Sequence, residues 1–499
     1  MKPVLVLLEK SADASEYAPF REMQLLYGLV PVEVQVVKDG FTFQREGDKY
    51  SMVIVPTCKM LTTQLPSGAK IRDILATWLD GSIPAFVANA INAEDFTTTD
   101  GKQYTAGVTN RTAFDTSTWG IGELYDINEN RIGSDGQLPF YATTAHAGYY
   151  RNSYDCKPLL QYEGNYTIAW AWTGGKYPVV YFSARIGFTP FLLYAMKLAN
   201  LPISIPVAIT LDDADGDFIA DPAKIESMLA RIQSLDGYAL CGFKVYNIAS
   251  IPNALKVAYS KYSDAVISIA HGHTASIDDE YWWHEKDVYP SYGIWGSQHY
   301  DITKTGTYGT SASNPGSGKL GALSYDIAHL KAQGWIPNLQ EHQHYCGYCY
   351  LPNNGYSMAG LRALVADGVK MIRGSISFSQ SGSQIVRISG SQQWTSPTLV
   401  IKDDNDKDAV IRFMCPSWGV NGTSDGSSNL SDLCYNTVVN LARIISYGSI
   451  IAMYTHGNNY TNDTTGAKYL YGFHRNMDLI EFCQPVLRLL KKGEVPYKL

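Results

Sequence analysis

Charged residues are scarce in this chain of 499 residues. Asp, Glu, Lys and Arg together make up 17% of the sequence, and the formal net charge is −7. Proteins that bind nucleic acid or anionic membranes carry an excess of positive charge where they bind. The composition therefore argues against nucleic acid as a partner. The sequence also lacks any run of about eighteen apolar residues, so we expect no membrane-spanning segment.

Cysteine is sparse as well. The chain has 8 cysteines, and only Cys346 and Cys349 are closely spaced. Cysteines this scattered do not predict a dense disulfide framework. The apolar stretch at 4–8 stops too early for a signal peptide and predicts a first strand. Either a leader was removed, or the protein leaves its cell another way, such as in a virion released by lysis. We therefore expect an extracellular, cell-surface or virion-associated protein.

Aromatic residues, in contrast to charged residues, are abundant in this chain. The 35 tyrosines and 10 tryptophans fit a protein that stacks aromatic rings on sugars, and they equally fit extracellular β-rich or virion proteins. Apolar residues make up 45% of the chain, so it can bury a sizeable core. The length indicates more than one domain.

Two accessory domains are expected before the catalytic one. Residues 1–92 alternate strands and helices, which predicts a small α/β domain that resembles flavodoxin-like or amidotransferase-like folds. This region has no nucleophile motif and no Gly-rich phosphate loop. Residues 93–202 predict an irregular β-rich domain, in which Trp170 and Trp172 contact glycan or fill a core. We expect no catalytic group before about residue 200, so a chain that begins near Leu201 should keep its activity.

A third domain, which carries the catalytic residues, is expected at residues 203–499. From residue 206 onward strands alternate with crossover helices, which is typical of an incomplete or distorted barrel. Seven strands are expected, at 207–212, 239–245, 265–270, 335–339, 369–373, 410–414 and 449–454. Helices are expected at 222–234, 253–262, 320–333, 357–366, 431–447 and 476–492.

The first of these strands runs into a cluster of acids. Five of the seven residues from Ile205 to Leu211 are apolar, the pattern of a strand buried on both faces in a parallel sheet. Barrels and open α/β sheets place their active sites at the carboxyl ends of such strands. A solvated acidic turn is the alternative. Four aspartates follow the strand: Asp212, Asp213, Asp215 and Asp217.

The segment Thr210-Leu211-Asp212-Asp213-Ala214 resembles the Thr-Phe-Asp-Asp-Gly motif of polysaccharide deacetylases of the NodB-homology type. These are metal-dependent carbohydrate esterases with a distorted (β/α) barrel. The resemblance implies that Asp212 is the catalytic base and that Asp213 is a metal ligand. Ala214 stands where the motif has Gly, and the two later aspartates are additions that could compete for either role.

Two histidines, His271 and His273, directly follow the expected strand at 265–270. Imidazoles separated by one Gly can both turn toward one point, and neutral imidazole is a preferred ligand of zinc. With the carboxylate of Asp213 they give a two-His, one-Asp set that leaves positions open for water and substrate. We therefore expect a divalent metal cofactor, with zinc as the ion.

The histidine pair departs from the family's second motif, His-Ser/Thr-x-x-His. Starting at His273, that motif would require a His where Ile277 stands. His271 is the alternative partner, and either of two acids could substitute if His271 faces away: Asp278 or Asp279.

The last expected strand ends in Thr455-His456. It resembles the family's closing motif, an apolar strand ending in Leu-x-His, whose histidine protonates the leaving group. The resemblance assigns the role of general acid to His456. A structural histidine at a strand end is the alternative.

Aromatic and histidine residues after other strands are candidates for substrate binding. Trp282 and Trp283 lie in an aromatic insertion. We interpret this insertion as a loop that covers the substrate or as an interface with another subunit. The segment from Glu341 to Cys349 either lines the pocket or binds a structural zinc through two His and two Cys. The family's Arg-x-Pro-Tyr motif and its later Asp and Trp are absent. The substrate-binding candidates are Trp282, Trp283, His342, His344, Tyr345 and Trp418.

These patterns together predict a metal-dependent hydrolase that removes acetyl groups from an N-acetylated or O-acetylated polysaccharide. One alternative is a glycoside hydrolase that pairs Asp212 with Asp215, Asp217 or Glu341. The other is a non-catalytic glycan-binding or virion tail protein. Assembly into a homo-oligomer or a virion stays open, as does the choice between a Cys346–Cys349 disulfide and metal binding.

Overall fold

The structure is a computed structural model of the whole chain. It describes the following residues: 2–8, 30–37, 49–56, 63–75, 79–88, 108–113, 118–133, 137–142, 147–151, 154–164, 166–184, 188–212, 214, 222–243, 248–270, 307–311, 314–317, 323–340, 371–373, 379–381, 384–386, 398–402, 407–417, 451–456 and 477–491.

The chain forms two compact units. The first unit comprises Met1–Ile205, Gly422–Gly448 and Tyr471–Arg488, and the second comprises Pro206–Asn421, Ser449–Leu470 and Leu489–Leu499. The division at residues 205 and 206 lies close to the boundary expected at 202 and 203. Two later segments, however, belong to the first unit although they were expected in the catalytic domain.

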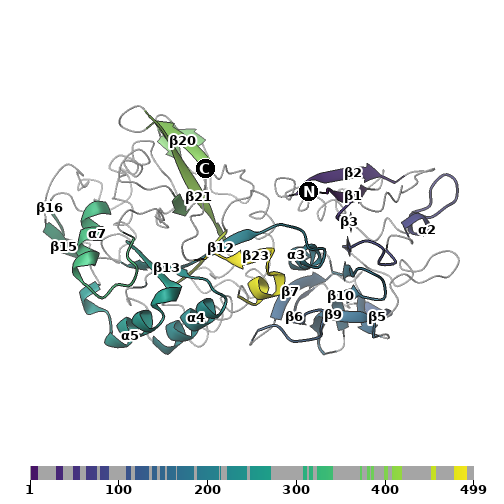
Figure 1. Ribbon diagram of the computed structural model, residues 1–499, viewed down its shortest axis with the longest axis horizontal. Coiled ribbons are helices and arrows are strands. Elements are labelled where there is room, and N and C mark those ends of the chain that lie inside the picture. The colour runs from purple at the N-terminus through teal and green to yellow at the C-terminus, as the bar shows by residue number, and fades with distance from the viewer. Residues whose placement is uncertain are drawn as a thin grey trace. The chain divides into compact units, whose positions relative to one another are not determined.

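One sheet of 11 strands runs through the described part of the first unit (Figure 1). Its parallel half has the order β2-β1-β3-β4-β11, and its antiparallel half continues as β10-β9-β6-β7, with β5 paired to β8 and β8 to β10. The strands are β1 (Val4–Leu8), β2 (Val32–Val36), β3 (Met52–Val55), β4 (Ala85–Val87), β5 (Val108–Ala113), β6 (Thr118–Leu124), β7 (Gln137–Ala142), β8 (Ala147–Arg151), β9 (Cys156–Tyr162), β10 (Tyr166–Trp172) and β11 (Val179–Phe182).

The pairing of β4 with β11 joins the two regions that were expected as separate domains. Val179 of β11 lies opposite Ala85 of β4 in parallel register. The boundary expected at residues 92 and 93 therefore falls inside one continuous sheet. The sequence pattern predicted strands in both regions, but it carried no information about which strand would pair with β4.

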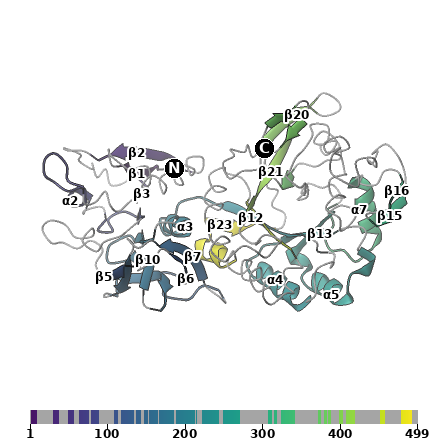
Figure 2. The ribbon, with the colours of Figure 1, turned by 180° about the vertical axis from the view of Figure 1, so that it is seen from behind.

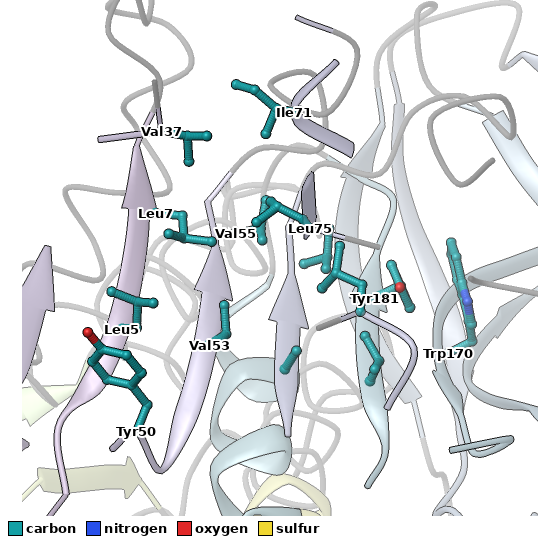
Figure 3. Packing of buried hydrophobic residues seen from close by; sticks show 14 of the residues in the cluster. Leu5, Leu7, Val37, Tyr50, Val53, Val55, Ile71, Leu75, Trp170 and Tyr181 are labelled. Atoms are coloured by element: carbon teal, nitrogen blue, oxygen red, sulfur yellow. The ribbon is translucent and has the colours of Figure 1, made fainter. Parts of the chain in front are cut away.

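The core of the first unit also crosses that boundary (Figure 3). Leu5 and Val53 from the parallel half belong to the same buried cluster as Trp170 and Tyr181. The rings of Trp170 and Tyr181 stack with their centroids 5.2 Å apart. Trp170 is 0% exposed, so it is a core residue and not a surface for glycan. The helix α2 (Ile71–Leu75) contributes two side chains to this cluster, Ile71 and Leu75.

The first unit is completed by a helical segment near the C-terminus. Residues 477–483 are helical, and the ring of Phe482 stacks on Tyr194 of α3 (Thr189–Leu198) with 4.0 Å between centroids. The backbone carbonyl of Phe482 accepts a hydrogen bond from Lys197 Nζ at 2.9 Å. The helix expected at 476–492 thus ends early, because Pro485 lacks an amide hydrogen and cannot continue it. A short strand, β23 (Leu487–Leu489), follows.

The sheet of the second unit has the order β14-β13-β12-β22-β21-β17. Every neighbouring pair in this order is parallel, while β20 (Thr398–Lys402) pairs antiparallel with β21 and β23 pairs with β12. The strands on the path are β12 (Ile205–Asp212), β13 (Ala239–Phe243), β14 (Val266–Ala270), β17 (Met371–Arg373), β21 (Asp408–Ser417) and β22 (Ile451–His456). Two short hairpins lie outside it: β15 (Thr307–Ser311) with β16 (Asn314–Ser317), and β18 (Ser379–Ser381) with β19 (Gln384–Val386).

Six of the seven strand positions expected in this region are confirmed, and the strand expected at 335–339 is absent apart from a single bridge. The six form the strands of the path, and the bridge joins Leu339 in parallel to Ser268 of β14. The result is an α/β arrangement of parallel strands, in which the described helices follow β12, β13 and β14.

Three of the expected helices are confirmed, and those expected at 357–366 and 431–447 lie outside the described residues. The helix α4 (Pro222–Ser234) follows β12, and α5 (Asn253–Lys261) follows β13; the two pack against each other (Figures 1 and 2). In α4 the buried residues recur at helical spacing and form one apolar face: Ile225, Met228, Leu229 and Ile232. The helix α7 (Leu323–Ala332) packs against β14. Within the ranges that the structure describes, no helix is both long and apolar enough to cross a membrane.

Candidate active site

The carboxyl ends of the parallel strands meet at one edge of the second unit's sheet. β12 and β22 are neighbours, and their register pairs the last residue of one with the last residue of the other, Asp212 with His456. Paired positions on adjacent strands are about 4.7–4.9 Å apart and share one face of the sheet. The predicted base and the predicted general acid therefore occupy adjacent positions, although they are distant in sequence.

The strand that precedes the histidine pair ends at the same edge. β13 lies between β12 and β14, and it is parallel to both. Leu211 pairs with Cys241, Cys241 pairs with Ser268, and Phe243 pairs with Ala270. β14 thus ends within one or two positions of the level at which β12 ends.

β12 is buried from Val207 to Leu211, as its apolar pattern predicted. Val207, Thr210 and Leu211 are each 0% exposed. Strands with both faces covered are typical of parallel α/β sheets, because helices pack on either side. The acids therefore begin where a fully buried strand ends.

The turn after β12 is anchored at Ala214. This residue is 0% exposed although it lies between aspartates in the sequence. Its amide donates a hydrogen bond to the carbonyl of Gly242 in β13 at 2.8 Å. Its carbonyl accepts one from the hydroxyl of Tyr259 in α5 at 2.9 Å. Ala214 is therefore held from two elements, β13 and α5.

An aromatic cluster, Phe243, Tyr259 and Trp335, supports these strand ends. The rings of Phe243 and Tyr259 meet edge to face with centroids 5.4 Å apart, and those of Phe243 and Trp335 with centroids 5.8 Å apart. Phe243 and Tyr259 are both 0% exposed. Edge-to-face contacts of this kind fix ring orientation as well as burying apolar area.

The segment after Trp335 is fastened to β14 by polar groups. The hydroxyl of Ser268 donates to the carbonyl of Pro337 at 2.6 Å, and the amide of Gln340 donates to the carbonyl of Ser268 at 2.9 Å. The side-chain amide of Asn338 donates to the carbonyls of Ser263 and Val266 at 2.6 and 2.9 Å. The chain therefore runs parallel to β14 up to Gln340, toward the edge where β14 ends.

The one cysteine side chain described within these strands is unsuited to the chemistry of the site. Cys241 is fully buried, and burial raises the pKa of its thiol well above the ordinary range. Thiolates, not thiols, are nucleophiles and metal ligands. Cys241 therefore acts as a small core residue.

Of the predicted site residues, the structure places the backbone of Asp212 and His456 and brings the two together. The remaining predicted residues lie outside the described residues: Asp213, His271, His273, Trp282, Trp283, His342, His344, Tyr345 and Trp418. Within the part of the chain that the structure describes, no group of three or more His, Cys, Asp and Glu gathers around one point.

Sequence reasoning missed Tyr259. It lies on the apolar face of α5 together with Leu255 and Ala258, so its spacing alone indicates a core residue. Nothing in the sequence of the helix shows that its hydroxyl reaches the turn after β12.

Comparison with known proteins gives weak similarities. No family model matches the chain, and no curated protein matches it. Among solved structures, a chain from Mycobacterium smegmatis assigned as a polysaccharide deacetylase aligns with 58% of this chain and 89% of its own, at 8% identity and a TM-score of 0.30. A glutamine amidotransferase from Thermotoga maritima aligns with 40% of this chain and 80% of its own, at 10% identity and a TM-score of 0.24.

An exo-β-1,4-mannosidase from an Opitutaceae bacterium also aligns with 40% of this chain, at 11% identity and a TM-score of 0.26. The chain spans only 33% of that enzyme's length. At these TM-scores none of the three similarities carries an argument about the fold or function of this protein.

Proposed function

We propose that the second unit is a metal-dependent deacetylase that removes acetyl groups from an N-acetylated or O-acetylated polysaccharide. The observation that carries this proposal is the register of β12 and β22, which pairs Asp212 with His456 at the carboxyl ends of two parallel strands. Those residues are the base and the acid in the deacetylase motifs that this sequence resembles. The pairing comes from the backbone register of β12 and β22, which is an observation separate from the sequence motifs.

The arrangement of strands is compatible with the barrel that the resemblance implies. The segment 335–340 lies beside β14 at one end of the described order, and β17 lies at the other end. In our proposal these two edges face each other and close a barrel of seven strands, which would turn the shared edge into the rim of a pocket.

Asp213, His271 and His273 are the residues that we propose to hold a divalent metal, with zinc as the ion. One carboxylate oxygen and two imidazole nitrogens form a donor set that suits zinc in a catalytic site. The strands that precede these residues, β12 and β14, end at the same edge with only β13 between them. A bound divalent ion supplies Lewis acidity, which lowers the pKa of a water and stabilises negative charge on the acyl oxygen.

The protein's own groups move the protons in the proposed reaction. Asp212 takes a proton from the water that attacks the acetyl carbonyl carbon. His456, at the neighbouring position, gives a proton to the nitrogen or oxygen of the sugar as the acyl bond breaks. Acetate and the free amine or hydroxyl are the products. An acid and a base on adjacent strands can act on either side of one acyl group.

Substrate contacts are proposed for residues that follow other strands of this edge. His342 lies three residues beyond Leu339, and His271 lies three residues beyond Ser268, with which Leu339 pairs. This equal spacing supports a place for His342 and the nearby His344 and Tyr345 at the pocket. The aromatic candidates for sugar stacking are Trp282, Trp283 and Trp418. A polymeric glycan substrate agrees with an extracellular, cell-surface or virion-associated protein.

The decisive experiment measures acetate release from acetylated glycans, such as N-acetylglucosamine oligomers and an O-acetylated xylan, with the full-length protein. We expect the protein to release acetate. This activity should be lost on treatment with a chelator and should return when Zn²⁺ is added. New reducing ends, with no acetate and no sensitivity to chelator, would show a glycoside hydrolase instead. Glycan binding without either product would show a binding protein.

A further inference from the structure

Among the described residues, Ala214 makes two backbone hydrogen bonds directly after β12. Ala214 has only a methyl side chain, so its own polar contacts are those of its backbone amide and carbonyl. The amide bonds to the strand beside it and the carbonyl bonds to Tyr259 of α5. Asp212 and Asp213 immediately precede this anchor and Asp215 immediately follows it.

The donor of the second bond is itself held rigidly. Tyr259 is 0% exposed, and its ring packs edge to face against Phe243, the last residue of β13. Phe243 packs in turn against Trp335, where the segment toward Gln340 begins. The ring of Tyr259 is therefore held by Phe243, which is itself held by Trp335.

We propose that Tyr259 is a positioning residue for the catalytic edge: its hydroxyl fixes the turn that carries the metal-binding and basic carboxylates. This inference rests on the proposed function and deepens it, because it names a residue that controls the site without touching the substrate. Metal ligands and bases must be held within about 0.5 Å of their productive positions. Loss of a group that orients a ligand typically lowers metal affinity or activity about 10–100-fold.

The variant Tyr259→Phe tests the hydroxyl alone, since it keeps the ring that packs on Phe243. The matched control is Tyr238→Phe, which deletes a hydroxyl from a tyrosine that is 1% exposed and lies before β13, at the opposite end of that strand. Zn²⁺ affinity is measured by calorimetry, acetate release gives kcat and KM, and hydrogen exchange by mass spectrometry reports the amide of Ala214.

We expect Tyr259→Phe to weaken Zn²⁺ binding about 10–100-fold and to lower kcat with KM roughly unchanged. Exchange at the Ala214 amide should rise, while the control stays like the wild type in all three measurements. Wild-type affinity and kcat in Tyr259→Phe would overturn the proposal, and so would equal losses in both variants, which would indicate general destabilisation.

The exchange measurement separates this proposal from the proposed function. If the wild type neither binds Zn²⁺ nor releases acetate, the deacetylase assignment fails. The positioning role of Tyr259 would then still be supported if hydrogen exchange at the Ala214 amide rises in Tyr259→Phe and does not rise in the control. Unchanged exchange in Tyr259→Phe would overturn it whatever the wild type does.

Discussion

The sheets of the two units differ in the direction of their strands. In the second unit every neighbouring pair from β14 to β17 is parallel, so all the carboxyl ends on that path lie at one edge. In the first unit a parallel half continues into an antiparallel half, where successive strand ends alternate between the two edges. A parallel sheet can therefore gather functional side chains from residues that are distant in sequence, which an antiparallel meander does less readily.

The two units also use polar groups differently. In the first unit, Glu129 pairs with Arg151 and Lys157, and all three side chains are about a quarter to a third exposed. Ion pairs with this exposure contribute little to stability. In the second unit, Ser268 and Asn338 donate to backbone carbonyls and thereby fix the segment beside β14. Those bonds hold residues 337 and 338 against β14 and the turn that precedes it.

The largest expected effect comes from the acids at the end of β12. Asp213→Ala should lose metal and activity together, since it removes a proposed ligand. Asp212→Asn should keep the metal and lose turnover by at least ~10²–10⁴-fold, the typical contribution of a general base. Metal content by elemental analysis and acetate release check both.

A matched control for these variants is Asp236→Asn, because Asp236 is an exposed acid at the other end of β13 that pairs with Lys491. It should behave like the wild type. Unchanged turnover in Asp212→Asn would contradict the assigned roles and make Asp215 the next candidate for the base.

The second prediction concerns the stability of the first unit. Phe482→Ala should lower its free energy of unfolding by about 3–5 kcal/mol, since the variant leaves a cavity beside Tyr194 where a ring is now 0% exposed. Calorimetry should show one transition shifted to lower temperature, with Zn²⁺ binding at low temperature unchanged. Equal shifts of all transitions would mean that the two units do not unfold separately.

The same contact bears on the expectation that a chain beginning near Leu201 keeps its activity. Such a chain lacks Tyr194 and Phe191, which pack on Phe482. Its C-terminal helical segment is then left without the surface that buries it. We expect this shortened chain to aggregate or to unfold at lower temperature than the full-length protein. A stable, active shortened chain would show that residues 477–488 do not need Phe191 and Tyr194 in order to fold.

The smallest expected effect is a loss of stability at alkaline pH. Burial raises the pKa of the Cys156 thiol to about 12 and raises that of Cys241 further. In the unfolded chain the thiols ionise near pH 8.5. Above that pH the unfolded state binds fewer protons than the folded state. The free energy of unfolding therefore falls as the pH rises toward the pKa of the folded state. Each thiol should cost at most about 1.4 kcal/mol per pH unit in this window.

Two variants assign this alkaline effect to the units. Cys156→Ala should flatten the pH dependence of the first unit's transition, and Cys241→Ala that of the second, in calorimetry between pH 8 and 10. The same slopes in wild type and variants would show that other groups dominate the alkaline loss.

The amino-acid sequence by itself determined much of the local structure. β1 at Val4–Leu8 and α4 at Pro222–Ser234 begin and end where the pattern predicts. Short apolar runs of β-branched residues and apolar spacing at the helical period are local signals, so they can be found without knowledge of partners. The position of Asp212 at the end of a buried strand could be predicted for the same reason, because the apolar run before it is a local signal.

Only the tertiary structure decided which of these elements are partners. It paired Asp212 with His456, joined β4 to β11 across an expected domain boundary, and placed Phe482 on Tyr194 in the first unit. It also showed that Tyr259, an apolar-face residue by its spacing, donates to Ala214. An apolar pattern states that a face must be buried, but many faces of similar size could bury it, and the choice among them depends on packing and strand register summed over the whole chain.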